Sequence, residues 1–200
     1  LLDDRPQTEV MAMIPQFSQA ETDNFVAPPA QIPEALGVLM FNMERGVNLP
    51  EIQEFLRDCP DIQPFDVILA NELDDGCARS GNKNTARELA QAFGLNYAWG
   101  LEFIELVNDE NAKGFHGNAV FSRWPIRRAG VIRLPEQYNW YFDRQKRIGG
   151  RLAVFAELDV GGQPVGAVSI HLENRTHGEG RKAQMAAILE AVRKELPDMP

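Results

Sequence analysis

The sequence is poor in cysteine and has no long apolar run. Its 200 residues include two cysteines, Cys59 and Cys77, which lie far apart. A structural zinc site needs about four ligands, usually in close pairs, so we exclude one and expect two reduced, partly buried thiols rather than a disulfide. Each apolar run spans a few residues, whereas a transmembrane helix needs about 20. The sequence therefore predicts no membrane span.

Positive charge is also scarce, because 20 lysines and arginines face 29 acidic residues and leave a net charge of −9. A uniformly acidic surface would repel nucleic acid and anionic lipid. The hydrophobic content of 44% and the charged content of 24% exclude a disordered or collagen-like chain. No basic segment followed by a long apolar stretch precedes the fold, so we identify no signal peptide, expect a soluble protein and predict no compartment.

Two short apolar runs each end in a polar residue. They are Leu36–Asn42 and Phe65–Glu72, and this pattern is typical of buried strands whose carboxyl ends reach a cleft. A helix is expected to begin between them, because Asn48 can cap it and Pro50 is tolerated in its first turn.

The remaining elements follow from apolar spacing and from glycine and proline signals. We expect helices over residues 84–93 and 179–196, strands over residues 97–103, 118–121, 152–158 and 165–172, and an extended lead-in over residues 1–33 with a short helix near residues 9–17. Apolar residues alternate over residues 97–103, which indicates a half-buried strand. The last helix is expected to place Met185 and Leu189 on its apolar face. Strand–helix–strand units precede antiparallel strands, so we predict a mixed α/β layered domain over residues 34–200.

Three polar residues fall at the ends of predicted strands, where α/β sheets open onto a cleft. Glu72 offers a carboxylate to a divalent cation such as Mg²⁺. Asn42 offers an amide that can hold a metal-bound water, a phosphate oxygen or the carboxylate itself. His171 can donate to a phosphoryl oxygen or exchange protons near neutral pH. Each residue alone is more typical of a turn, a cap or a structural histidine.

Five segments in a fixed order carry a resemblance to a known superfamily. They are L-M-F-N-M-E (Leu39–Glu44), D-V-I-L-A-N-E-L-D (Asp66–Asp74), G-N-A-V-F-S-R-W-P-I (Gly117–Ile126), S-I-H-L-E (Ser169–Glu173) and R-K-A-Q (Arg181–Gln184). From about residue 35 onward the sequence resembles the endonuclease/exonuclease/phosphatase superfamily, which comprises deoxyribonuclease-like metal-dependent phosphoesterases.

This resemblance implies a four-layer α/β sandwich, with two mixed β-sheets packed face to face and helices outside. It also implies hydrolysis of a phosphoester by in-line attack of water, assisted by Mg²⁺ or Mn²⁺. Glu72 matches the metal-binding glutamate, and Asn42 is a second metal candidate. Asn42, Glu72 and His171 are the catalytic candidates, with Asn42 and His171 stabilising the pentacoordinate phosphate. A catalytically inactive binding module of the same fold is the alternative.

Weaker candidates surround these three. The resemblance makes Arg151 a phosphate-binding residue, although a surface arginine on a strand edge fits its position nearly as well. Asn118 is a second substrate-binding candidate, for which support of a loop is the favoured role. His116 is expected to be exposed in a loop. The implied substrates are a nucleic acid, a phospholipid head group, an inositol phosphate or a small phosphodiester, and no stable protein partner is predicted.

One departure from the superfamily concerns the end of the sequence. Relatives continue after the last helix with a strand that carries Gly-Asp-x-Asn and later with an Asp-His pair, and neither motif is in this sequence. We therefore expect the N-terminal part of a longer protein, with an incomplete sheet that exposes an apolar face.

Residues 123–151 reverse the acidic balance of the chain. They hold two acidic residues and eight basic ones, Arg123, Arg127, Arg128, Arg133, Arg144, Lys146, Arg147 and Arg151. The resulting net charge of +6 leaves −15 for the remaining residues. Aromatic residues are interleaved, so a long loop that binds a polyanionic or base-containing substrate is one interpretation. Aromatic packing with solvated arginines is the other.

Overall fold

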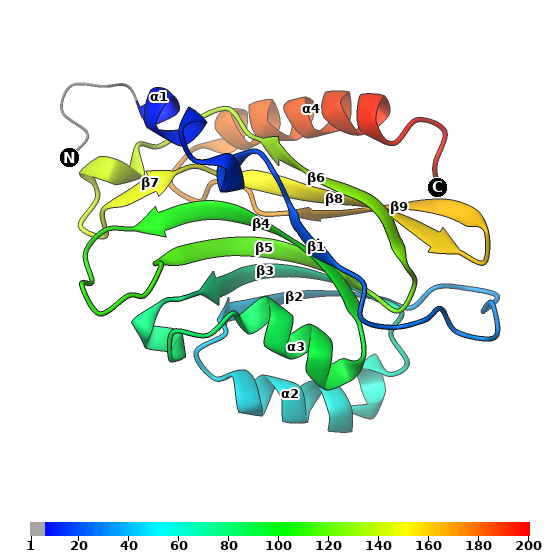
Figure 1. Cartoon of the computed structure of the whole chain (residues 1–200). Helices are drawn as coiled ribbons and strands as arrows, with labels where there is room; N and C mark the ends of the chain where they lie inside the picture. Colours follow the sequence, from blue (N-terminus) through cyan, green and yellow to red (C-terminus); the bar gives the residue numbers. More distant parts are fainter. Residues whose placement is uncertain (1–6) are drawn as a thin grey trace.

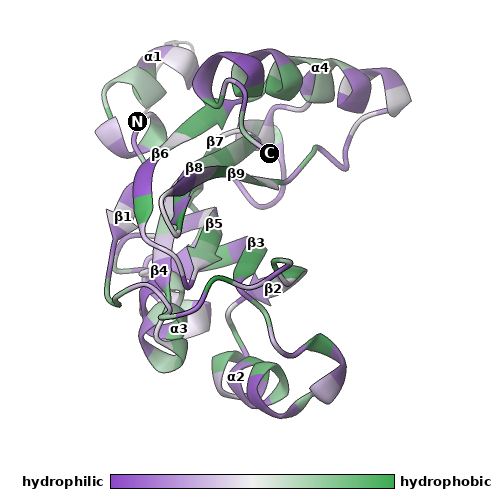
Figure 2. Ribbon diagram, turned by 90° about the vertical axis from the view of Figure 1, so that its right-hand side faces the viewer, coloured by the Kyte–Doolittle hydropathy of each residue, from purple (hydrophilic) through white to green (hydrophobic). Residues whose placement is uncertain are grey.

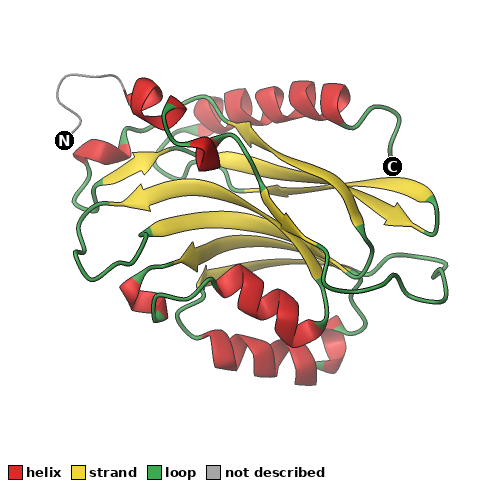
Figure 3. Ribbon diagram, in the orientation of Figure 1, coloured by secondary structure: helices red, strands yellow, loops and turns green. Residues whose placement is uncertain are grey.

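Two β-sheets and four α-helices make up residues 7–200, the part of the chain that the computed structural model describes (Figures 1 and 3). Residues 1–6 of the expected lead-in lie outside the described residues. The strands are β1 (Glu21–Asp23), β2 (Val38–Arg45), β3 (Val67–Asp75), β4 (Asn96–Glu105), β5 (Phe115–Ser122), β6 (Ile126–Arg133), β7 (Arg147–Gly149), β8 (Leu152–Val160) and β9 (Gln163–Ile170). The helices are α1 (Gln7–Ala12), α2 (Leu49–Asp58), α3 (Thr85–Phe93) and α4 (Gly178–Glu195), with short 3-10 turns at Pro15–Phe17, Pro60–Ile62, Ala78–Ser80 and Trp140–Phe142.

The elements form four layers, as predicted (Figure 2). The larger sheet has the order β1-β4-β5-β3-β2, with β7 also paired to β4, and the smaller sheet has the order β6-β8-β9. Strands β2 and β3 are parallel and are joined through α2, while the other pairs are antiparallel. Helices α2 and α3 cover the outer face of the larger sheet, and α4 covers the smaller sheet.

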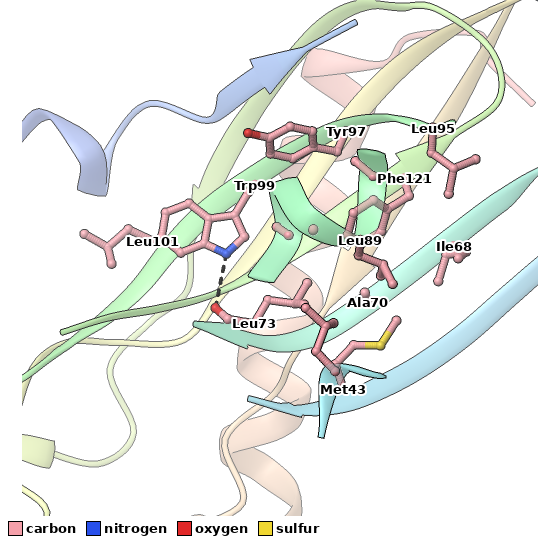
Figure 4. Packing of buried hydrophobic residues seen from close by; sticks show 14 of the residues in the cluster. Met43, Ile68, Ala70, Leu73, Leu89, Leu95, Tyr97, Trp99, Leu101 and Phe121 are labelled. Carbon is pink, nitrogen blue, oxygen red and sulfur yellow. Dashed lines mark hydrogen bonds between the residues drawn. The ribbon is translucent and has the colours of Figure 1, made fainter. Parts of the chain in front are cut away.

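Three apolar clusters hold the layers together. The cluster between the larger sheet and helices α2 and α3 includes Met43, Ile68 and Trp99 (Figure 4). A second cluster joins the two sheets, and a third packs α4 against the smaller sheet. Burying apolar surface contributes about 25 cal/mol per Å², so these three interfaces supply the main driving force for folding.

The bounds of α3 agree with those predicted from residues at its two ends. The Asn84 side chain accepts a hydrogen bond from the Arg87 backbone N–H at 2.9 Å and caps the first turn. Gly94 ends the helix with φ of +59°, in the left-handed region that glycine adopts at little cost. Leu89 and Ala90 are fully buried beneath it. The hairpin of β8 and β9 is also confirmed, with its turn at Gly161.

Burial of individual strands differs from the predictions. The half-buried strand expected over residues 97–103 is wrong, because β4 is central to the larger sheet and is covered on both faces. The prediction that residues 36–42 are buried is also wrong. Strand β2 is the edge of the sheet, where Val38 is 59% and Met40 is 77% exposed. Both are apolar side chains on the same face of this edge strand.

Three further predictions are corrected or refined by tertiary packing. Residues 123–151 are not one long loop, since they contain β6, a 3-10 turn and β7. Met185 and Leu189 lie on the exposed side of α4, whose buried residues are Gln184 and Ile188. Strand β1 of the lead-in pairs with β4, so part of the lead-in extends the larger sheet. Within the described residues, no helix is long and apolar enough to cross a membrane.

Candidate active site

A bulge near the carboxyl end of β3 aims Glu72 toward the smaller sheet. The register of β3 against β5 shifts between Ala70 and Leu73, and Glu72 has φ of +59°. Asn71 donates to the Ile170 carbonyl of β9, whereas Leu73 packs on the helix side. Two consecutive residues, Asn71 and Glu72, therefore face the same sheet, which regular alternation forbids.

His171 follows β9 and lies opposite this bulge. Its Nε2 atom is 3.8 Å from Oε1 of Glu72, and the two side chains are 19% and 25% exposed. Asn118 of β5 is fully buried and supports the bulge from the other side, because its Oδ1 accepts a hydrogen bond from the Glu72 backbone N–H at 3.2 Å. The Asn118 Nδ2 group has no hydrogen-bond partner within the described residues.

Glu102 lies at the centre of the site, and the sequence did not single it out. It is fully buried on β4, 3.4 Å from Nδ1 of His171, and its Oε1 accepts from the Arg151 guanidinium at 3.2 Å. Burial alone would raise the pKa of Glu102, but the Arg151 charge and the neighbouring His171 ring lower it to about 2. Glu102 is therefore an anion at neutral pH and orients both partners.

A second pair lies behind Glu102. His116 is buried on β5, so the prediction of an exposed loop histidine is wrong. Its Nδ1 lies 2.8 Å from Oδ1 of Asp74, and its Nε2 lies 3.8 Å from Oε2 of Glu102. Burial opposes the charge of Asp74, yet hydrogen bonds with Arg79 and His116 lower its pKa to about 2.

Arg151 is buried rather than exposed on a strand edge. Its guanidinium lies between two carboxylates, Glu102 at 3.2 Å and Glu173 at 3.4 Å, and its Nη1 is 3.0 Å from Nδ1 of His171. Burial disfavours this charge, but the two carboxylates raise the pKa of Arg151 above its usual value. The surface interpretation is therefore wrong, and phosphate binding by Arg151 stays a prediction.

Glu72, His116 and Arg151 border a polar cleft of about 210 Å³. Its lining includes Glu72, His116, Trp140 and four arginines, Arg45, Arg147, Arg151 and Arg175. Arg147 and Arg151 come from the basic segment, and Arg147 pairs with Glu105 at 3.0 Å. Other arginines of that segment pair away from the cleft, Arg127 with Asp159 and Arg128 with Glu195. The cleft thus gathers arginines although the whole chain is acidic, and carboxylates balance the buried Arg147 and Arg151. Arginine side chains can donate charge-assisted hydrogen bonds to an anion.

Asn42 is the predicted residue that is least integrated into this group. It pairs with Asn71 across β2 and β3, so it is near the bulge, but its side chain is exposed. Its Oδ1 accepts a hydrogen bond from the Glu44 backbone N–H at 2.9 Å. A role in metal or phosphate binding stays a prediction for Asn42.

The donor set fits a cation such as Mg²⁺ that keeps most of its water. In residues 7–200, no group of three or more His, Cys, Asp and Glu side chains is arranged to hold a metal ion. Mg²⁺ commonly uses one or two carboxylates together with water and substrate phosphates. Glu72 is the partly exposed carboxylate of this cleft, and it meets that requirement.

Comparison with solved structures gives the fold. No protein-family model matches the chain, and neither does any curated protein sequence. An endonuclease/exonuclease/phosphatase from Beutenbergia cavernae DSM 12333 is 21% identical with a TM-score of 0.57, and the match covers 76% of this chain and 43% of that one.

Two further structures agree. An endonuclease/exonuclease/phosphatase family protein from Leptotrichia buccalis C-1013-b is 18% identical with a TM-score of 0.51, covering 82% of this chain and 65% of that one. The human Nocturnin catalytic domain, solved with a bound sulfate anion, is 19% identical with a TM-score of 0.54, covering 90% and 63%. The chain thus has the endonuclease/exonuclease/phosphatase fold that its motifs predict, and it spans 43% to 65% of the length of these three structures.

Proposed function

We propose that this protein is a divalent-metal-dependent hydrolase of phosphoester or phosphodiester bonds. The observation that carries this proposal is the approach of His171 to Glu72 at 3.8 Å beside an arginine-lined cleft. The proposed substrate is a phosphoester, with a nucleic acid, a phospholipid head group, an inositol phosphate or a small phosphodiester as the candidates. The fold of the neighbours supports this class of reaction without selecting among these substrates.

Each side chain has a separate part in the proposed reaction. Glu72, with Asn42 as the second candidate ligand, would hold Mg²⁺ or Mn²⁺. The bound metal would neutralise charge on the phosphoryl group and on the leaving oxygen. Arg151 and His171 would donate hydrogen bonds to the phosphoryl oxygens, where negative charge develops during in-line attack by water.

Glu102 keeps His171 in position for this role. Nδ1 of the ring faces Glu102 and the Arg151 guanidinium, while Nε2 faces Glu72. Nε2 is therefore the ring nitrogen that would meet a phosphate bound beside Glu72. Asn118 contributes indirectly, because it holds the backbone of the bulge that aims Glu72.

The test is hydrolysis of bis(4-nitrophenyl) phosphate by the protein with Mg²⁺, with Mn²⁺ and with a chelator. We expect metal-dependent activity that falls at least about a hundredfold in Glu72→Ala, because the variant lacks the metal-binding carboxylate. Glu179→Gln is the matched control, since this side chain is 89% exposed on α4. Equal activity of Glu72→Ala and the parent protein would refute the site assignment.

The alternative is a binding module of the same fold without catalysis. The intact arrangement of Glu72, His171 and Glu102 argues against it, because a pure binding site has no need of an oriented imidazole beside a free carboxylate. Phosphate binding without hydrolysis of any substrate in a panel of DNA, RNA, sphingomyelin and inositol phosphates would favour this alternative.

A further inference from the structure

Glu173 lies behind the cleft and organises its wall. It is buried, and both of its carboxylate oxygens accept hydrogen bonds. Oε1 accepts from the Arg175 backbone N–H at 2.8 Å. Oε2 accepts from Nε1 of Trp140 at 2.8 Å and from Nε of Arg151 at 3.4 Å. All three donors belong to residues that line the cleft.

Three arginines of the cleft pack around the ring system of Trp140. The guanidinium groups of Arg147, Arg151 and Arg175 lie 5.0, 5.5 and 5.9 Å from the centroid of its ring system. Contacts of this kind between a cation and an aromatic face are attractive within about 6 Å. The hydrogen bond from the indole N–H to Glu173 fixes the rotation of the ring, and the ring in turn fixes the plane against which three cations pack.

Gln184 anchors Glu173 from the opposite side. It is a buried polar residue on the inner face of α4. Its Oε1 accepts from the Glu173 backbone N–H at 2.9 Å, and its Nε2 donates to the Pro135 carbonyl at 3.1 Å. Both ends of the amide are therefore used. This explains why the segment R-K-A-Q opens the helix with a glutamine at a buried position.

We propose that Glu173 is a positioning residue that arranges Trp140 and Arg151 for binding of a phosphate group, and that Gln184 holds Glu173 in place. The choice of phosphate as the bound anion rests on the proposed function, whereas the positioning of Trp140 and Arg151 by Glu173 does not. A glutamine cannot replace Glu173, because each carboxylate oxygen faces an N–H donor. The amide would turn its NH₂ toward one of these donors, either the Arg175 backbone or the pair formed by Trp140 and Arg151.

The experiment uses protein labelled with ¹⁵N at the tryptophan indoles and titrated with inorganic phosphate. The chain has three tryptophans, and Trp140→Phe assigns the signal of Trp140. We expect Glu173→Gln to shift this signal before phosphate is added and to weaken phosphate binding roughly ten- to a hundredfold, as expected for displaced binding groups. Gln184→Ala should act in the same direction with a smaller effect, and Glu179→Gln should match the parent protein.

Two outcomes separate this proposal from the proposed function. A folded Glu173→Gln variant with the parent's Trp140 signal and phosphate affinity would overturn the positioning role, and Gln184→Ala decides by the same readouts if Glu173→Gln fails to fold. Absence of phosphate binding in the parent protein would instead count against the proposed function. The Trp140 signal of the variants would then still test the positioning role.

Discussion

Nδ1 of His171 lies 3.4 Å from Oε2 of Glu102, a contact between the end of β9 in the smaller sheet and the buried face of β4 in the larger one. The carboxylate has no access to water, so its partners within the protein sustain its charge. This arrangement couples the stability of the sandwich to the geometry of the candidate active site.

Acid should destabilise the protein in part through Glu102. Its pKa in the folded state is about 2, below the usual value of 4.5. The ionised Glu102 carboxylate therefore stabilises the folded state fully above about pH 5, and this stabilisation is lost as the pH falls toward 2. It amounts to on the order of 3 kcal/mol. Urea unfolding between pH 7 and pH 2.5 should give a shallower loss of stability for Glu102→Gln than for the parent. Parallel curves would contradict this.

In the proposed hydrolysis, the Glu102→Gln variant should lose the positioning of His171 and Arg151 but keep metal binding. Glu102 contacts His171 and Arg151, whereas the metal candidate is Glu72. We therefore expect kcat to fall about a hundredfold with little change in the Mg²⁺ concentration for half-maximal activity. Mg²⁺ titrations of the two variants test this. In Glu72→Ala the Mg²⁺ requirement itself should rise. Equal Mg²⁺ requirements for both variants would argue against this division of roles.

The backbone at Glu72 predicts a difference between two variants that both lack the carboxylate. With φ of +59°, an alanine at this position remains in the left-handed region, which costs about 1 kcal/mol for a residue with a Cβ atom. Glu72→Gly should therefore be about 1 kcal/mol more stable than Glu72→Ala in urea unfolding. An alanine variant as stable as the glycine variant would mean that the bulge relaxes when the carboxylate is removed.

The two thiols should differ in reactivity. Both cysteines are free; Cys59 is half-buried and Cys77 is fully buried. Burial raises the pKa of Cys77 to about 12, so it has almost no thiolate at neutral pH. Labelling with 5,5′-dithiobis(2-nitrobenzoate) should modify one thiol in the folded protein and two in urea. The Cys77→Ser variant keeps Cys59 and should be labelled quickly in the folded state. The Cys59→Ser variant keeps Cys77 and should be labelled only after unfolding.

Local elements were predictable where the signal lies in neighbouring residues. The cap at Asn84 and the stop at Gly94 defined α3, and the glycine pair at Gly161 defined the hairpin, because such signals act within one turn of the chain. Burial was less predictable, since β4 and β2 carry comparable apolar residues yet occupy the centre and the edge of the same sheet. Position within a sheet depends on strand order, which local spacing does not encode.

The sequence alone determined the fold, through five ordered segments, and it named Glu72 and His171 as candidates from their places at strand ends. Only the tertiary structure brought Glu102 to His171, 69 positions away in the chain, and only the bulge in β3 turned Glu72 toward the smaller sheet. A lone carboxylate in the apolar strand of residues 97–103 was the signal for Glu102. Its meaning depended on pairing registers, because a shift of one residue moves a side chain to the opposite face of a sheet.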